Sequence, residues 1–201
     1  MKSILIIGVA RAGKSTLSDM IKQKYPGYNL VHSDNIKWAI IRANGEEKYF
    51  RENIDKQSKW ELSLRFQKTL LEFFNLSSRS DRGEYKYILE SGQLDPKYVR
   101  ENVDFATTSV VCLGLGDLSA DKIFNLCRKH DTDKDWTFEV SDEDLRKHSE
   151  EWFAQNEKLK KDCAKYGIKY IDTTKNREKI LAKIMSEIEK EDEIFFVKGE
   201  K

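Results

Sequence analysis

A glycine-rich segment near the N-terminus carries the residues best suited to chemistry. Residues 8–16 read GVARAGKST and match the pattern G-x-x-x-x-G-K-[ST] at every defined position. Gly8 lets the chain turn sharply as it leaves a strand, and Gly13 permits a backbone conformation that a side chain disfavours, so successive N–H groups can point at one anion. Lys14 can then reach the β- and γ-phosphates of a nucleotide, and the Ser15 hydroxyl can bind magnesium. The pattern predicts a phosphate-binding loop.

The whole loop is expected to contact the nucleotide, because the N-terminal end of the following helix also offers free N–H groups and a positive dipole. The predicted nucleotide-binding residues are Gly8, Ala10, Arg11, Ala12, Gly13, Lys14, Ser15 and Thr16, with ATP and Mg²⁺ as cofactors. The alternative is a glycine-rich turn that binds nothing. Its position argues against that alternative, because the motif follows an apolar run and opens a helical pattern.

Two acidic residues follow other apolar runs of the sequence. Asp34 comes after residues 29–32, and Glu90 closes residues 86–90. In open α/β sheets, functional groups gather at the carboxyl ends of the strands. We therefore expect both carboxylates near the loop. The alternative for Asp34 is the N-cap of a helix over residues 35–43, a position that aspartate fills well, and one residue can serve both purposes.

Strand and helix patterns alternate along the chain. Apolar runs predict strands at residues 3–7, 29–32, 86–90, 109–113 and 168–171. Helical periodicity and capping signals predict helices at residues 14–24, 35–43, 55–76, 96–103, 120–130, 141–166 and 176–189. Residues 195–197 fit either a late strand or a packed tail. The alternation implies parallel pairing and an α/β layered sheet in one domain.

Composition limits the class of protein and its partners. A chain of 201 residues with 39% hydrophobic residues can build one domain with a substantial core. Lys+Arg 36 against Asp+Glu 35 gives a balanced surface, so nucleic acid is disfavoured as a partner. The three cysteines lack metal-ligand spacing and are expected to be reduced thiols. No apolar run approaches the roughly 20 residues of a membrane span, so we expect a cytoplasmic protein without a membrane partner.

The order of strand, loop, Asp34 and Glu90 resembles the small P-loop kinases related to adenylate kinase, shikimate kinase, gluconate kinase and the zeta-toxin-like kinases. The resemblance covers motif order over most of the chain, but specific residues only in the loop and at these two acids. It implies a three-layer P-loop NTPase fold with a five-stranded parallel sheet of order 2-3-1-4-5. It also implies a helical substrate-binding segment at about 35–80 and a lid at about 128–141. In this group the equivalent of Asp34 positions or deprotonates the acceptor hydroxyl, and the equivalent of Glu90 holds magnesium through water.

Arg128 is the predicted catalytic arginine, because it lies where the lid begins and bidentate guanidinium contacts neutralise a transferring phosphoryl group. The sequence departs from adenylate kinase in two ways: no arginine follows Glu90 before Arg100, and Arg128 and Arg146 are far apart. The expected pocket wall mixes aromatic and basic side chains, namely Trp38, Arg42, Tyr49, Phe50, Arg51 and Trp60. A phosphorylated or carboxylated metabolite, or a nucleoside, would suit such a wall.

The predicted function is an ATP- and Mg-dependent phosphotransferase that moves the γ-phosphate to a small-molecule acceptor. Its catalytic residues would be Lys14, Asp34 and Arg128, and its metal partners Ser15 and Glu90. Two alternatives stay open at this point. A nucleotide-binding regulatory module without phosphotransfer is favoured by the missing acceptor motif, and a polynucleotide end kinase is disfavoured by the balanced charge.

Overall fold

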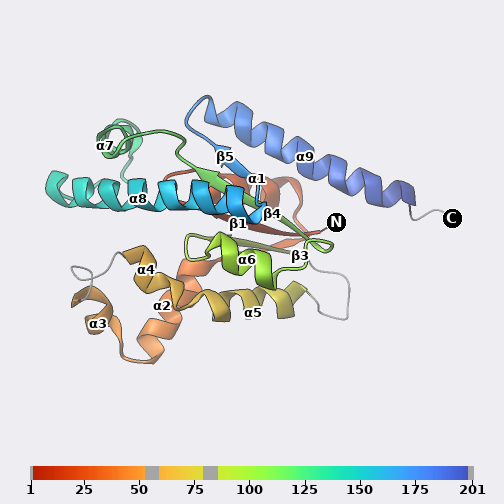
Figure 1. Cartoon of the computed structure of the whole chain (residues 1–201), viewed down its shortest axis with the longest axis horizontal. Coiled ribbons are helices and arrows are strands. Elements are labelled where there is room, and N and C mark those ends of the chain that lie inside the picture. Colours follow the sequence, from red (N-terminus) through yellow and green to blue (C-terminus); the bar gives the residue numbers. More distant parts are fainter. Residues whose placement is uncertain (1, 53–58, 79–85, 199–201) are drawn as a thin grey trace.

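Five strands form one parallel sheet in the computed structural model, which describes residues 2–52, 59–78 and 86–198. The strands are β1 (Ser3–Gly8), β2 (Tyr28–His32), β3 (Lys86–Ser91), β4 (Thr108–Gly114) and β5 (Tyr170–Asp172). Their order across the sheet is β2-β3-β1-β4-β5, and every neighbouring pair is parallel (Figure 1). The predicted strand order and fold class are confirmed.

Helices connect the strands and form the outer layers. They are α1 (Lys14–Lys24), α2 (Ser33–Ala43), α3 (Glu47–Glu52), α4 (Lys59–Leu64), α5 (Gln67–Ser78), α6 (Pro96–Asn102), α7 (Ala120–His130), α8 (Asp142–Tyr166) and α9 (Arg177–Lys198). Figure 1 shows α8 running across the molecule, with α7 beside its N-terminal end and the group α2–α5 on the other side. Among the described residues, no helix combines the length and the apolar character that crossing a membrane requires.

Strand β1 lies at the centre of the sheet and explains the apolar run that precedes the loop. All six of its residues are buried, and residues 4–7 are at most 1% exposed. A strand covered on both faces needs apolar side chains at every position rather than at alternate ones. Helices α5 and α8 contact the sheet at β3 and β4, and α6 packs against both of these helices. The right-handed crossover from β1 to β2 places α1 on the opposite face, where an ion pair between Lys24 and Glu189 joins it to α9.

Three predicted helices differ from the observed ones. The helix predicted over 55–76 is two helices, α4 and α5, because the chain turns between them, with Phe66 N donating to Ser63 O at 3.1 Å. Residues 53–58, where that prediction began, lie outside the described residues. Helix α9 continues to Lys198, so residues 195–197 form neither a strand nor a separate tail. Helix α2 starts at Ser33, which puts Asp34 inside its first turn rather than at its N-cap.

Candidate active site

The loop between β1 and α1 has the backbone that phosphate binding requires. Gly8 has φ +142° and Gly13 has φ +87°, and Arg11 is also left-handed at φ +64°. A Cβ atom at Gly8 would lie 2.0 Å from the carbonyl oxygen of Leu113 on β4, so only glycine fits there. Gly13 stands at the N-cap of α1, and in the described chain no side chain caps this helix and its first turn holds no acidic residue. Its first N–H groups are therefore left for an external anion.

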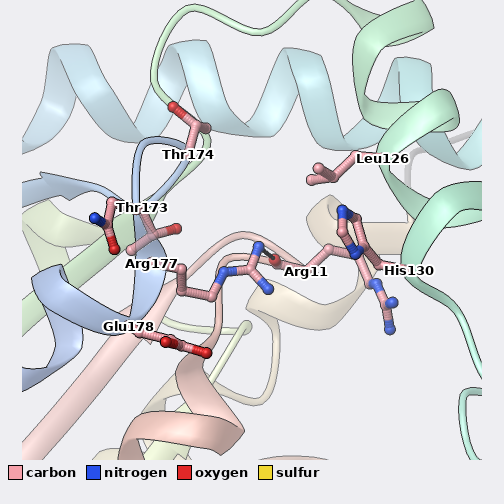
Figure 2. A pocket seen from close by; sticks show the side chains of 8 residues that line it. Arg11, Leu126, His130, Thr173, Thr174, Arg177 and Glu178 are labelled. Carbon is pink, nitrogen blue, oxygen red and sulfur yellow. Dashed lines mark hydrogen bonds between the residues drawn. The ribbon is translucent and has the colours of Figure 1, made fainter.

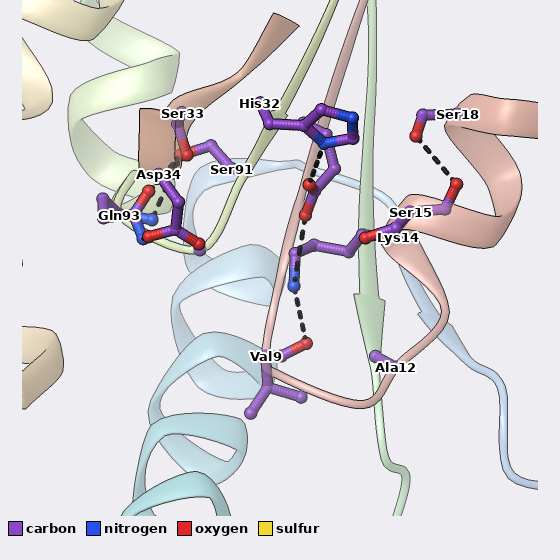
Figure 3. A network of polar contacts seen from close by, with 12 residues as sticks. Val9, Ala12, Lys14, Ser15, Ser18, His32, Ser33, Asp34, Ser91 and Gln93 are labelled. Carbon is purple, nitrogen blue, oxygen red and sulfur yellow. Dashed lines mark hydrogen bonds and ion pairs between the residues drawn. The ribbon is translucent and has the colours of Figure 1, made fainter. Parts of the chain in front are cut away.

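Lys14 is held beneath the loop by two oxygens of different kinds. Its Nζ atom donates to the carbonyl oxygen of Val9 at 3.0 Å and lies 3.6 Å from Glu90 Oε1 (Figure 3). The other oxygen of Glu90 contacts His32 Nδ1 at 2.9 Å, since the parallel register places these two residues opposite each other. The side chains of Lys14 and Glu90 are only 9% and 13% exposed. The predicted phosphate ligand and the predicted magnesium partner are thus neighbours at the carboxyl end of β1 and β3.

Asp34 presents an oriented carboxylate at the end of β2. Its side chain is 61% exposed, and its Oδ1 atom receives an ion pair from Lys37 on the next turn of α2. Gln93 donates to the same oxygen at 3.0 Å from the segment that follows β3. Gln93 is itself bound to the hydroxyls of Ser33 and Ser91 (Figure 3). Sequence reasoning missed Gln93, although its place two residues beyond β3 puts it at the functional edge of the sheet.

Two cavities of similar size border the loop. The first, of about 430 Å³, is bordered by Arg11, the end of α7 and the segment between β5 and α9; we call it the Arg11 cavity (Figure 2). The second, of about 440 Å³, is lined by Lys14, Asp34 and Glu90 together with four tryptophans; we call it the tryptophan cavity. The structure therefore brings three of the predicted site residues into one cavity, and Ala10 lines it as well. The hydroxyl-bearing residues Ser15 and Thr16 are exposed on the first turn of α1.

The segment that follows β5 connects the Arg11 cavity to the loop. Thr173 is buried, and its hydroxyl lies 2.9 Å from the carbonyl oxygen of Ala12 and 3.0 Å from that of Gly114. Arg177, at the start of α9, donates to the carbonyl oxygen of Arg11 at 2.9 Å. Burial lowers the pKa of Arg177, and the nearby Arg11 charge lowers it further. Arg177 was not predicted, because nothing in the local sequence marks a residue that reaches the loop from 166 positions away in the chain.

Ion pairs of Arg11 connect the segment between α7 and α8 to the loop. Arg11 Nη1 donates to Asp135 Oδ1 at 2.5 Å, and Nη2 pairs with Asp131. The Arg11 hydrogen bond is the main reason that the pKa of Asp135 is lowered to about 2. Burial opposes the positive charge of Arg11, but its aspartate partners outweigh burial and raise the pKa of Arg11. The predicted lid therefore lies against the phosphate loop.

Arg128 lies elsewhere. Its guanidinium donates to Asp142 Oδ1 at 2.9 Å and to the carbonyl oxygens of Thr137 and Val140 at 3.1 and 2.6 Å. These contacts hold the end of α7 to residues 137–142, and Arg128 lines neither cavity. Its catalytic role stays a prediction, while the arginines that border the loop are Arg11 and Arg177.

The expected pocket wall is partly present. Trp38 and Trp60 line the tryptophan cavity. The remaining predicted wall residues are exposed Arg42 and Tyr49, buried Phe50, and Arg51, whose side chain lies outside the described part of the structure. Sequence reasoning missed two further wall residues. Trp136 lies between α7 and α8, where no periodic pattern exists, and helical periodicity places Trp152 on a buried face without telling which cavity that face borders.

Comparison with known proteins gives a consistent answer at the level of fold. No family model and no curated protein sequence matches the chain. A gluconokinase from Sinorhizobium meliloti 1021 matches with a TM-score of 0.57 at 15% identity, covering 98% of this chain and 97% of that one. The fold is that of the small P-loop kinases. A deoxyadenosine kinase from M. mycoides matches with a TM-score of 0.51 at 15% identity over 94% of this chain and 99% of that one. A dephospho-CoA kinase from Campylobacter jejuni gives 0.51 at 13% identity over 94% and 98%.

Proposed function

We propose that the protein is an ATP- and Mg-dependent phosphotransferase that moves the γ-phosphate to the hydroxyl of a small molecule. One observation carries the proposal: the phosphate loop borders two cavities, and one of them holds Lys14, Asp34 and Glu90 together. Transfer requires a donor site and an acceptor site that meet at the moving phosphoryl group, whereas a nucleotide sensor needs only the donor site. The fold shared with several kinases supports the same conclusion.

The Arg11 cavity is the proposed site of the nucleotide base, and the loop N–H groups would hold the phosphates. Lys14 would exchange its contact with the Val9 carbonyl for phosphate oxygens, which keep its charge paired. The residues present fit magnesium, since the exposed Ser15 hydroxyl stands on the first turn of α1 and the Glu90 carboxylate lies beside Lys14. A bound magnesium ion would supply charge neutralisation on the phosphate oxygens.

The tryptophan cavity is the proposed acceptor site. Asp34 would accept the proton of the acceptor hydroxyl or orient that hydroxyl for in-line attack. Lys37 and Gln93 fix its carboxylate from two different elements, which favours one geometry over many. In the same proposal, Arg128 adds positive charge from the start of the lid, the role that its place in the sequence predicts. The expected cytoplasmic location stays a prediction.

The test compares phosphoryl transfer with nucleotide binding in matched variants. Wild-type protein, Lys14→Ala and Asp34→Asn would be incubated with γ-labelled ATP, magnesium and a metabolite extract, and labelled products would be counted. The controls are Lys183→Ala on α9 and Asp19→Asn on α1, which make the same chemical changes at exposed positions.

We expect Lys14→Ala to lose nucleotide binding and transfer, and Asp34→Asn to keep binding while transfer falls at least a hundredfold. Both controls should behave as wild type. Unchanged activity in Asp34→Asn, with nucleotide binding lost in Lys14→Ala, would instead favour a regulatory module without an acceptor. Absence of transfer to any component of the extract would contradict the proposal directly.

A further inference from the structure

All four tryptophans of the chain line one cavity. Trp38 comes from α2, Trp60 from α4, Trp136 from the segment between α7 and α8, and Trp152 from α8. Trp136 and Trp152 meet edge to face at 6.1 Å, and His148 stacks on Trp152 at 5.8 Å. If these four indoles served only hydrophobic burial, all of them would be expected in the core. Trp136 is instead 61% exposed. Their convergence indicates a wall built to hold a flat ring.

A polar group in this wall has no partner in the protein. The Trp60 indole Nε1 atom is buried and makes no hydrogen bond within the described structure. An indole N–H donates only, and burial without an acceptor costs free energy. A ligand that brings an oxygen or ring nitrogen to this atom would recover that cost. Gln155, which also lines the cavity and donates to the carbonyl oxygen of Gly92 at 3.3 Å, offers a second polar side chain that can pair with the edge of a ring.

The charges in the cavity oppose an anionic acceptor. The described lining contains two lysines, Lys14 and Lys37, and three carboxylates, Asp34, Glu90 and Glu151, so its formal balance is 2 − 3 = −1. Both lysines are already paired, Lys14 with Glu90 and Lys37 with Asp34. No arginine belongs to the described lining, although arginine is the side chain suited to bidentate recognition of phosphate and carboxylate. A phosphorylated or carboxylated acceptor would enter without a cation to meet it.

We propose that the acceptor is an uncharged nucleoside, an inference that rests on the proposed phosphotransferase function. Its base would stack among the tryptophans, and its sugar hydroxyl would face Asp34. In the reaction, the hydroxyl oxygen forms a bond to the γ-phosphorus of ATP while the bond from that phosphorus to the bridging oxygen of ADP breaks. Asp34 takes the hydroxyl proton, so the products are a nucleoside monophosphate and ADP.

The experiment uses the protein's own tryptophans as the reporter, because every one of them lines the cavity. The full chain would first be saturated with magnesium and a non-hydrolysable ATP analogue, which occupies the nucleotide site. Adenosine, guanosine, cytidine, thymidine and their 5′-monophosphates would then be titrated while tryptophan fluorescence is recorded. In parallel, each compound would be offered as acceptor to the protein with labelled ATP.

We expect at least one nucleoside to change the fluorescence and to become phosphorylated, and its 5′-monophosphate to bind at least tenfold more weakly. Trp136→Leu should weaken nucleoside binding about tenfold, the loss of one base–aromatic stack. Phe138→Leu in the same segment is the matched control, because Phe138 is 52% exposed and lies outside the described cavity lining. It should leave binding unchanged.

The outcomes separate this inference from the function on which it rests. No fluorescence change with any nucleoside, or a monophosphate that binds as tightly as its nucleoside, would overturn the inference. Gluconate and shikimate would be offered as acceptors in the same assay, and transfer to either in preference to all nucleosides would overturn the inference while leaving the phosphotransferase proposal standing. Nucleoside binding that Trp136→Leu weakens, without transfer to any compound, would support the assigned ligand and contradict the reaction.

Discussion

Removal of the Arg11 guanidinium is predicted to destabilise the fold, mainly through Asp131. The Asp131 side chain is only 2% exposed, and its Oδ2 atom is buried without a hydrogen-bond partner in the described structure. Among the ion pairs of the described residues, Arg11 is its one cationic partner. Arg11→Met keeps the apolar stem and removes the charge. The carboxylate left behind is buried and uncompensated, which costs about 3–5 kcal/mol.

Asp135 contributes much less to the same loss. Its side chain is 29% exposed, and it keeps hydrogen bonds at 3.0 Å from the backbone N–H and the hydroxyl of Thr132. Solvent can screen this carboxylate, so its pair with Arg11 is worth about 1 kcal/mol or less. The structure therefore predicts that Arg11→Met costs about 4 kcal/mol, most of it from one buried charge.

Urea denaturation of four proteins at neutral pH tests this division. Asp131→Asn added to Arg11→Met should restore about 2 kcal/mol, because a buried neutral amide is less costly than a buried unpaired charge. Arg42→Met serves as the control, since that arginine is 70% exposed and pairs with Glu47 at the surface, and it should cost below about 1 kcal/mol. The reasoning fails if Arg11→Met is no more harmful than Arg42→Met, or if Asp131→Asn brings no relief.

Three further outcomes are expected from the geometry. Gly8→Ala should prevent stable folding, because its Cβ would lie 2.0 Å from a backbone oxygen of β4. Gly13→Ala should lower the stability measured by thermal denaturation by about 1–2 kcal/mol. The nearest atom to its Cβ would be 3.4 Å away, so only the left-handed backbone is strained. The pKa of Asp135 is lowered to about 2, below its ordinary value of 3.8, so its contribution is complete above about pH 4 and is lost as the pH falls toward 2. The stability difference between wild type and Asp135→Asn should vanish over that interval. Burial raises the pKa of Tyr170 to about 12, so one of the eight tyrosines should ionise late in an absorbance titration. Tyr170→Phe should remove that late step. It should also lower the free energy of unfolding by about 1–2 kcal/mol, because the hydrogen bond to Asn156 is lost.

Local patterns in the sequence predicted the phosphate loop well, for a physical reason. The residues of the motif work within one short stretch of chain. Gly8 and Gly13 adopt backbone conformations that other residues disfavour, and Lys14 directly follows Gly13. Helix α1 accordingly has the predicted bounds, Lys14–Lys24. The parallel sheet followed from the alternation of strands and helices, since each crossover has only one favoured hand. The break between α4 and α5 was missed because Phe66 continues the apolar pattern of a helix while its backbone turns.

The acceptor side of the site could not be predicted in the same way, because its chemistry is distributed over the chain. The four tryptophans stand up to 114 positions apart, 152 − 38, and no local motif marks any of them as a pocket residue. Gln93 belongs to the site because it donates to Asp34, which lies 59 positions earlier and comes within reach only when β2 and β3 pair. A phosphate loop needs backbone amides that are consecutive in sequence, whereas a pocket that selects an acceptor needs side chains that are adjacent in space. For that reason the three-dimensional arrangement, rather than any motif, carries the argument for a flat and uncharged acceptor.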